Sequence, residues 1–431
     1  MKYYSLNHIA PNTTFENAVI KGLAPDRGLY FPETITALDP SFFETIETLS
    51  NEEIAYEAIK QFISPEIPEA ILKTIVSETL SFEFPVVKLT DSISTLELFH
   101  GPTMAFKDVG ARFMARCLGH FNKNNSNEVT VLAATSGDTG GAVANGFLGV
   151  KGVKVVILYP SGKVSDIQEK QLTTLGQNIT ALEVEGTFDD CQDMVKKAFL
   201  DTDLTSKMQL TSANSINVAR WLPQLFYFMF AYKQLKNKYK DIVFSVPSGN
   251  FGNVCAGMIA QKLGLPIKHF IASNNDNNVV TRYLKSADYE PKPSVQTVSN
   301  AMDVGNPSNF IRIQAIYNND FETLKSNLSS YSFSDIETKE ALDEIYTTTG
   351  YIADPHGAVG YLGCKSYLMT NSEAHCVFLE TAHPTKFLDV VKEVVAVDIP
   401  LPKQIKAVID KVKVATQIND YSEFKAFLTE L

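Results

Sequence analysis

Residues 129–147 read VTVLAATSGDTGGAVANGF, and residues 242–263 read IVFSVPSGNFGNVCAGMIAQKL. In both stretches, a short apolar run typical of a buried β-strand leads into a polar, glycine-bearing loop and then into a helix-like segment. Further apolar runs at 153–159 and 267–273 continue the alternation of strands and helices. This alternation predicts a parallel sheet with helices on both faces, an α/β fold. Open sheets of this kind bind ligands beyond the carboxyl ends of their strands, which is where both loops lie.

The rest of the chain has a different rhythm. Residues 50–81 carry apolar side chains at helical spacing, which predicts a mainly helical N-terminal region. Residues 286–309 are too rich in Pro, Asn and Ser for a regular element, and we expect them to line a cleft or to connect layers. At 431 residues the chain exceeds what one hydrophobic core usually supports, so we expect two or three domains.

Composition excludes several classes of protein. No stretch approaches the roughly 20 apolar residues of a membrane-spanning helix, and the polar opening MKYYSLNHIAPN lacks a secretory signal, so we expect a cytoplasmic protein. The five cysteines are scattered and form no CxxC, which argues against a disulfide framework and a zinc site; we expect no metal. The formal net charge of −11 disfavours binding to nucleic acid or to anionic lipid.

The loop at 248–253, SGNFGN, has the composition of a phosphate-binding loop. Its glycines allow close approach of a ligand, and successive backbone N–H groups can converge at the start of the following helix. The helix dipole adds partial positive charge there without any lysine. An ordinary tight turn with a polar cap would show a similar pattern, so both readings stay open on these residues alone.

The loop at 135–141, TSGDTGG, offers the hydroxyl groups of Ser136 and Thr139 together with glycine backbone. Asp138 would repel a phosphate placed directly beside it. Its carboxylate is suited instead to accept a hydrogen bond from a phenolic or amine group, or to cap the helix that follows.

The segment HGPTMAFKD at 100–108 places Lys107 between a breaker-rich turn and a helix-like stretch. A lysine can form a Schiff base with a carbonyl cofactor, and burial lowers its pKa toward the neutral amine that this requires. Most lysines are solvated surface charges, and this second reading stays open. The chain contains no GxGxxG, GxxxxGK[ST], GxSxG or HExxH, which weakens nicotinamide, ATP, acyl-transfer and zincin readings.

Taken in order, these segments resemble those of the threonine synthases, which are pyridoxal 5′-phosphate (PLP) enzymes of fold type II. HGPTMAFKD resembles the family's cofactor-lysine motif, ATSGDTGGA its first glycine loop and PSGNFGN its phosphate loop. The resemblance runs from about residue 3 to about residue 390, and further family-like segments are NTTFENAVIKGLAPDRGLYFPE, NSINVARWLPQ, NAMDVGNPSNF, DPHGAVGY and ETAHPTKF.

The resemblance implies two three-layer α/β domains around a PLP cleft. It places an N-terminal subdomain at 1–95, a smaller α/β domain with the first glycine loop at 96–205, and a larger α/β domain with the phosphate loop at 206–431. Lys107 becomes the Schiff-base lysine and the catalytic residue. The implied cofactor-binding residues are Lys107, Asp138, Gly249, Asn250, Phe251, Gly252, Asn253 and Thr381. Thr381 would face the pyridine nitrogen, and Asn253 stands where Asp is expected in relatives, which affects only fine tuning.

The resemblance also implies conversion of O-phosphohomoserine and water to L-threonine and inorganic phosphate. A separate clamp must hold the substrate phosphate, and basic groups with hydroxyls suit a dianion. Arg220 and Lys163 are the candidate basic groups, with Ser136 and Thr103 as further donors. Arg220 could instead pair with an acidic residue, and Lys163 could be a solvated turn residue.

A second hypothesis is a PLP-dependent phospho-lyase or a serine or threonine dehydratase, which would release a 2-oxo acid. The cofactor motifs are compatible with both. The opening GLAPDRGLYFPE together with HGPTMAFKD favours the synthase, because dehydratases are expected to carry a different lysine context. In either case we expect a small-molecule substrate and a monomer or homodimer.

Overall fold

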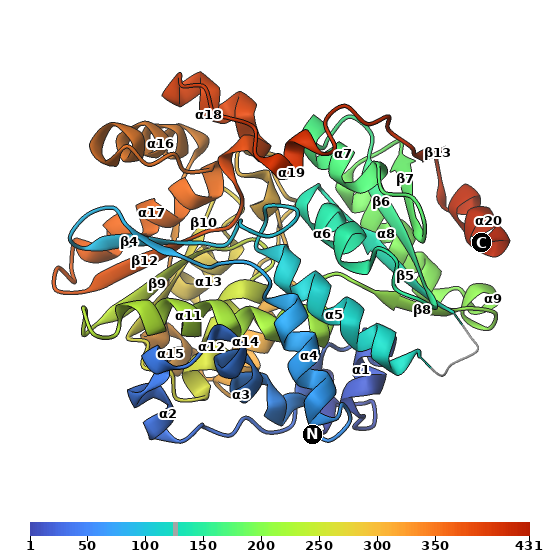
Figure 1. Ribbon diagram of the computed structural model, residues 1–431, viewed down its shortest axis with the longest axis horizontal. Coiled ribbons are helices and arrows are strands. Elements are labelled where there is room, and N and C mark those ends of the chain that lie inside the picture. Colours follow the sequence, from blue (N-terminus) through green and yellow to red (C-terminus); the bar gives the residue numbers. More distant parts are fainter. Residues whose placement is uncertain (124–127) are drawn as a thin grey trace.

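The N-terminal region is mainly helical, as its periodicity predicts. The computed structural model describes residues 1–123 and 128–431 (Figure 1). A short antiparallel pair opens the chain, and the helices that follow pack beneath the rest of the molecule. The elements are β1 (Tyr3–Ser5), α1 (Phe15–Lys21), β2 (Tyr30–Pro32), α2 (Pro40–Glu44), η1 (Ile46–Thr48), α3 (Asn51–Ile63) and α4 (Glu69–Thr79).

The larger sheet has its strands in the order β11, β10, β9, β12, β4, β3, and only the pairing of β3 with β4 is antiparallel. Its central strands are buried on both sides, which explains their almost continuous apolar sequences. The strands are β3 (Val86–Lys88), β4 (Ile93–Glu97), β9 (Ile242–Pro247), β10 (His269–Asn274), β11 (Leu328–Ser332) and β12 (His375–Glu380).

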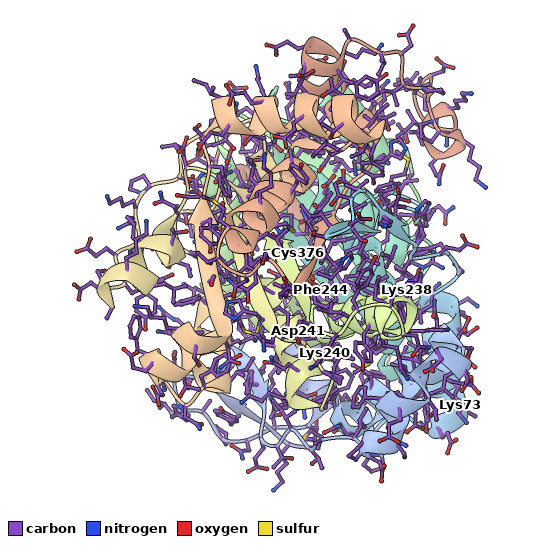
Figure 2. The ribbon with its side chains drawn as sticks, turned by 90° about the vertical axis from the view of Figure 1, so that its left-hand side faces the viewer. Lys73, Lys238, Lys240, Asp241, Phe244 and Cys376 are labelled. Carbon is purple, nitrogen blue, oxygen red and sulfur yellow. The ribbon has the colours of Figure 1, made fainter. Side chains whose placement is uncertain are left out.

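Helices cover both faces of the larger sheet. Phe244 of β9 packs on Phe228 below the sheet, whereas the next residue, Ser245, donates a hydrogen bond to the Gly360 carbonyl above it. Figure 2 shows Phe244 beside Cys376 of the neighbouring strand β12. The helices are α11 (Leu225–Leu235), α12 (Gly252–Lys262), α13 (Val279–Ser286), η3 (Asn300–Met302), α14 (Phe310–Ile316), α15 (Phe321–Asn327), α16 (Asp335–Thr349), α17 (Pro355–Leu368), η4 (Pro384–Phe387) and α18 (Leu388–Val395).

The smaller sheet is parallel throughout, with its strands in the order β13, β7, β6, β5, β8. Val131 and Val155 point into the main core. Leu132 and Val156 point into a second cluster, which the helices α8 (Phe188–Leu200) and α20 (Tyr421–Glu430) help to form. Its elements are α5 (Lys107–Phe121), β5 (Val129–Ala134), α6 (Asp138–Phe147), β6 (Val153–Pro160), α7 (Asp166–Thr173), β7 (Ile179–Val184), α8 (Phe188–Leu200), α9 (Thr202–Thr205), β8 (Gln209–Ser212), α10 (Val218–Trp221), η2 (Leu222–Gln224), α19 (Lys403–Lys406), β13 (Thr416–Ile418) and α20 (Tyr421–Glu430).

The domain ranges predicted from the sequence stay predictions, and strands from different ranges share a sheet. Strands β3 and β4 fall almost entirely within the predicted N-terminal range 1–95, yet they hydrogen-bond into the larger sheet. Strands β8 and β13 fall within the range 206–431, yet they complete the smaller sheet. Beyond α18 the chain crosses the top of the molecule through α19 to reach β13 and α20 (Figure 1). Which strands share a sheet therefore depends on pairing between segments that are distant in the chain, not on the order of the strands along it.

Both glycine-bearing loops lie where the sequence predicts, at the carboxyl ends of β5 and β9. The structure thus confirms the alternating α/β arrangement that positions a ligand at these strand ends. Within residues 1–123 and 128–431, no helix has the length and apolar character needed to cross a membrane.

Candidate active site

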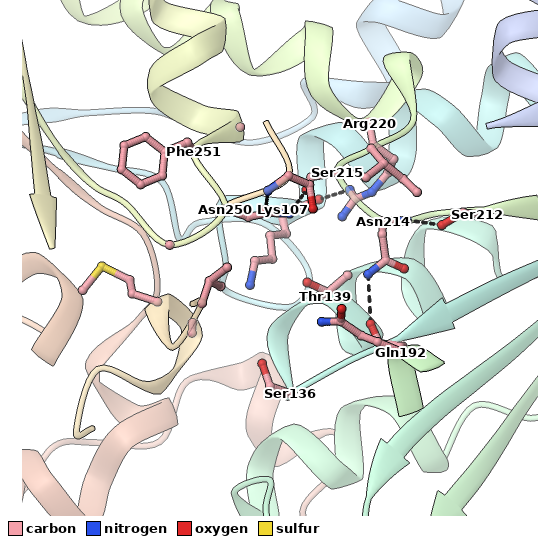
Figure 3. A pocket seen from close by; sticks show the side chains of 18 of the residues that line it. Lys107, Ser136, Thr139, Gln192, Ser212, Asn214, Ser215, Arg220, Asn250 and Phe251 are labelled. Atoms are coloured by element: carbon pink, nitrogen blue, oxygen red, sulfur yellow. Dashed lines mark hydrogen bonds between the residues drawn. The ribbon is translucent and has the colours of Figure 1, made fainter. Parts of the chain in front are cut away.

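A cavity of about 530 Å³ lies where the strand ends of the two sheets face each other (Figure 3). The smaller sheet contributes Ala134 and Ser136, and the larger sheet contributes the whole 247–253 loop and Thr381. Part of the irregular segment 286–309 also lines the cavity, from Asn300 to Val304. The expectation that this irregular segment borders a cleft is therefore confirmed.

Lys107 is the first residue of α5, and its side chain extends into this cavity (Figure 3). The backbone around it is held from several directions. The Phe106 N–H donates to the Thr381 carbonyl at 2.8 Å, and the Lys107 carbonyl accepts from the Arg220 guanidinium at 2.9 Å. The amine is therefore presented from a rigid support rather than from a mobile surface loop.

The surroundings of Lys107 favour its neutral form. Burial lowers the pKa of the Lys107 amine below its usual value. The Asp138 carboxylate acts to raise the pKa of Lys107, whereas the cations Lys386 and Arg220 lower it further. A neutral amine is the nucleophilic form that attacks a carbonyl carbon, so the site suits covalent attachment of a carbonyl cofactor.

The 248–253 loop has the backbone geometry of a ligand cradle. Phe251 adopts a left-handed φ of 60° immediately before α12 begins at Gly252. A Cβ on Gly249 would lie 2.7 Å from the Met302 Cα, so only glycine allows this approach of the two loops. The Asn274 amide donates to the Ser248 carbonyl at 2.6 Å and fixes the loop from behind.

The donor set at this loop fits a bound phosphate group. The first N–H groups of a helix have no partner inside the helix, and those of α12 start at the cavity. The Asn253 side chain is buried at the same place, and neither its Oδ1 nor its Nδ2 has a hydrogen-bond partner within the described part of the chain. An unpartnered amide donor at the cavity fits a ligand group that accepts hydrogen bonds.

The structure places the other predicted site residues unequally. Arg220, Ser136 and Thr381 line the cavity, as does the whole predicted phosphate loop. Lys163 instead lies exposed in the turn after β6 and does not border the cavity. Thr103 is buried outside the lining, where its hydroxyl donates to Asp108 at 2.6 Å. The predicted four-residue phosphate clamp is thus only half assembled at the cavity.

Asp138 sits behind the cavity lining rather than in it. Its carboxylate forms an ion pair with Lys386 at 2.6 Å and accepts a hydrogen bond from the Gln168 amide at 2.9 Å. Burial raises its pKa, but the ammonium groups of Lys386 and Lys107 more than offset this, so that the net pKa lies well below its usual value. Asp138 is therefore a buried charge near Lys107. It does not cap helix α6, because the N-cap residue of this helix is Gly137.

Sequence reasoning missed Lys386, His356 and Ser215. His356 lines the cavity, is held by Asp354 at 2.7 Å and accepts from the Ala301 N–H at 3.2 Å. The Ser215 hydroxyl accepts a hydrogen bond from Asn250 at 2.8 Å. All three lie inside segments that resemble family motifs, so the motifs were a signal, but no local pattern assigned these residues a partner.

The composition of the site is that of an organic-cofactor enzyme. Within residues 1–123 and 128–431, no group of three or more His, Cys, Asp or Glu side chains could hold a metal ion. The cavity instead combines a lysine with a lowered pKa, a phosphate-type loop and several neutral donors.

Comparisons with known proteins agree with this arrangement. A family model described as "Pyridoxal-phosphate dependent enzyme" matches residues 94–379, and models for the threonine synthase N terminus and C-terminal region match residues 2–80 and 357–428. A threonine synthase of Haemophilus influenzae is 43% identical, with 99% of each chain covered.

Solved structures give the same result. The crystal structure of threonine synthase from Escherichia coli matches with a TM-score of 0.93 at 38% identity, covering 100% of both chains. The PLP-bound threonine synthase from Brucella melitensis matches with a TM-score of 0.93 at 33% identity, covering 100% of this chain and 99% of that one. Because these family models and threonine synthases match almost the whole length of the chain, the chain belongs to the threonine synthase family of pyridoxal-phosphate-dependent enzymes.

Proposed function

We propose that the protein converts O-phosphohomoserine and water to L-threonine and inorganic phosphate, with PLP bound in the cavity around Lys107. The observation that carries the proposal is the meeting of Lys107, the 248–253 loop and Arg220 in one cavity. This set provides an amine for a carbonyl cofactor and two separate places for anions, as a phosphorylated cofactor and a phosphorylated substrate require.

The cofactor would be held at three points. Lys107 would bind its aldehyde carbon, the loop from Gly249 to Asn253 would bind its phosphate, and Thr381 would face its ring nitrogen. When bound, PLP supplies a conjugated ring that accepts electron density from the substrate's reacting carbons. The neutral hydroxyl of Thr381 does not force a proton onto the ring nitrogen, so the protein moderates that electron withdrawal.

Lys107 has a second task once the substrate amine has replaced it. Its neutral amine takes the proton from the substrate Cα and moves protons at Cβ, because both carbons come within reach of one flexible side chain. Phosphate would leave from Cγ as one Cβ proton is removed. A proton would then be delivered to Cγ to form the methyl group, and water would add its hydroxyl at Cβ while Cα regains a proton. The lowered pKa of the amine suits these transfers near neutral pH.

The substrate phosphate belongs on the side of Arg220. Its guanidinium uses two N–H groups on the carbonyls of Ala213 and Lys107, and the remaining ones are available to an anion. Asn214 and Ser215 lie near Arg220 in the cavity and add neutral donors, whereas Ser136 lines the cavity farther from it (Figure 3). Lys163 and Thr103, which the sequence suggested for this clamp, are not part of this proposal.

An absorbance and product assay tests the function. We expect the purified protein to bind PLP with a visible absorbance band that Lys107→Ala abolishes, and to release threonine and phosphate in equal amounts from O-phosphohomoserine. Lys73→Ala, on the exposed surface of α4, is the matched control and should behave as the unchanged protein. Release of 2-oxobutyrate with phosphate would show the lyase instead, and absence of any band after reconstitution with PLP would refute the cofactor assignment.

The cellular setting is proposed on separate grounds. All five cysteines are buried free thiols, which fits the reducing cytoplasm expected from the sequence. The monomer or homodimer expected from the sequence stays a prediction, which size-exclusion chromatography with light scattering would decide.

A further inference from the structure

Lys386 is a buried cation that the reaction described above does not use. It lies in η4, directly after β12 of the larger sheet, and its side chain is 0% exposed. A charged lysine is costly to bury unless it is paired and hydrogen-bonded. Its Nζ meets both conditions, because it lies 2.6 Å from the Asp138 carboxylate and donates to the Thr103 carbonyl at 2.9 Å.

These contacts join three segments around Lys107. Asp138 begins α6 on the smaller sheet, and Thr103 belongs to the turn that leads into Lys107. Helix α7 supports both partners, since Gln168 donates to Asp138 at 2.9 Å and Gln171 donates to the Thr103 carbonyl at 3.1 Å. The pair is therefore a built arrangement rather than a chance contact.

The charges that face Lys107 are Asp138, Lys386 and Arg220. The titratable groups near Lys386 also include Asp108 and His383, and burial lowers the pKa of His383 to about 4. Without Lys386, Asp138 would be an uncompensated buried anion beside Lys107, and it would stabilise the protonated amine. The neighbouring cation offsets part of this attraction, because its own field acts against a second positive charge nearby.

We propose that Lys386 is a positioning residue that, by pairing with Asp138, keeps Lys107 available as a neutral amine. The inference rests on the proposed function in that Lys107 is the residue which binds the cofactor. It goes beyond that function because it says what controls the charge state of Lys107, namely the ion pair between Lys386 and Asp138, which joins the two sheets.

The test compares Lys386→Met, Asp138→Asn and the double variant in the full-length holoenzyme. The readout is the pH midpoint of the absorbance change of the bound cofactor. A second readout, after cofactor removal, is the pH dependence of Lys107 labelling by an amine-reactive reagent, measured by mass spectrometry. Lys392→Met, an exposed lysine of α18, is the matched control and should leave both midpoints unchanged.

We expect Lys386→Met to raise both midpoints by about one pH unit or more, which is tenfold in protonation, and Asp138→Asn to lower them. The double variant should lie between the two single variants. It removes both charges together, so it keeps the proposal testable if a single variant unfolds. A purely structural role predicts lost thermal stability without displacements of opposite sign.

The proposal is overturned if Lys386→Met folds and retains the unchanged midpoints, or if both single variants shift in the same direction. A double variant displaced beyond either single variant would overturn it as well. The labelling readout needs no substrate. If the midpoints move as expected while the unchanged protein makes no threonine, the proposed function fails and the role of Lys386 stands.

Discussion

Asn253 shows how a single side chain can report a missing ligand. It is 6% exposed, lines the cavity at the first turn of α12, and has no hydrogen-bond partner within residues 1–123 and 128–431 for either polar side-chain atom. An unsatisfied buried amide costs about 1–3 kcal/mol, which a bound phosphate group can return. The Asn253 amide thus offers an unused donor to a ligand in the cavity.

We predict that Asn253→Ala weakens PLP binding by about tenfold, equivalent to one hydrogen bond of about 1.4 kcal/mol. The cofactor-free protein should keep its thermal stability or gain about 1–3 kcal/mol, because the substitution removes an unsatisfied buried amide and no protein hydrogen bond. Spectroscopic PLP titration and thermal unfolding measure the two effects. Asn274→Ala is the contrasting variant. The Asn274 amide donates to the Ser248 carbonyl at 2.6 Å, so its loss should lower thermal stability in addition to PLP affinity.

At the scale of elements, the approach of the 248–253 loop to η3 decides the shape of the cavity. Gly249 meets Met302 so closely that a Cβ would lie 2.7 Å from backbone. Backbone cannot swing aside as a flexible side chain can, so η3 or the loop must move. The phosphate cradle and the cavity wall are therefore coupled.

Gly249→Ala is expected to lower PLP affinity more than tenfold and to destabilise the fold by about 1–3 kcal/mol through overpacking. The matched control is Gly141→Ala in α6, where a Cβ would meet side-chain atoms only at 3.4 Å and beyond. Alanine favours a helix over glycine by about 1 kcal/mol, so this control should be neutral or stabilising. Urea unfolding measures the stability of both variants, and PLP titration measures their cofactor affinity. Equal losses in Gly249→Ala and Gly141→Ala would contradict the steric argument.

Helix α20 is the second element whose packing carries a consequence. Phe424 is fully buried and packs in the cluster formed with Cys191 and Met194 of α8. The C-terminal end of the chain is thereby part of the core of the smaller sheet.

We predict that Phe424→Ala destabilises the protein by about 3–5 kcal/mol, the usual cost of deleting a buried phenyl group. Denaturant unfolding of the cofactor-free protein measures the loss. Phe427, only partly buried on the same helix, is the control, and Phe427→Ala should cost clearly less. A loss below about 1 kcal/mol for Phe424→Ala would show that α20 is dispensable for the smaller sheet.

Across the whole molecule, buried histidines link stability to pH. Burial lowers the pKa of His269 and of His375 to about 4. His375 is 2% exposed and pairs with the Ser94 hydroxyl at 2.9 Å, whereas His269 pairs with Ser329 at 2.8 Å. Both lie at strand starts of the larger sheet, away from the glycine loops.

A folded-state pKa below the unfolded value of about 6.5 means that the unfolded chain binds the proton first. The stabilisation is complete above pH 6.5 and is lost as the pH falls toward 4. We expect the free energy of unfolding to fall over this window by about 1–3 kcal/mol per histidine. His375→Gln, which removes one titrating group, should flatten the profile measured by urea unfolding at several pH values. An unchanged slope in this variant would exclude the assignment.

The sequence by itself determined the local pieces: the strand–loop–helix units around 135–141 and 248–253, the lysine at 107 and the helical N-terminal region. These depend on periodicity, turn residues and helix starts, which act within about 20 residues and can be recognised along the chain. The family resemblance pointed to Lys107 and to the loop at 248–253, which both line the cavity, while their roles toward a cofactor stay predictions.

Only the tertiary structure decided which distant segments meet. Asp138 and Lys386 lie far apart in the chain, and the sequence alone indicated no reason to pair them. The same holds for β13 joining β7, for the Thr103 carbonyl accepting from Lys386, and for Lys163 remaining at the surface. Local patterns determine which element forms, whereas burial and pairing of charges depend on the packing of many elements at once, because a charge keeps its place only where a partner and the exclusion of water coincide.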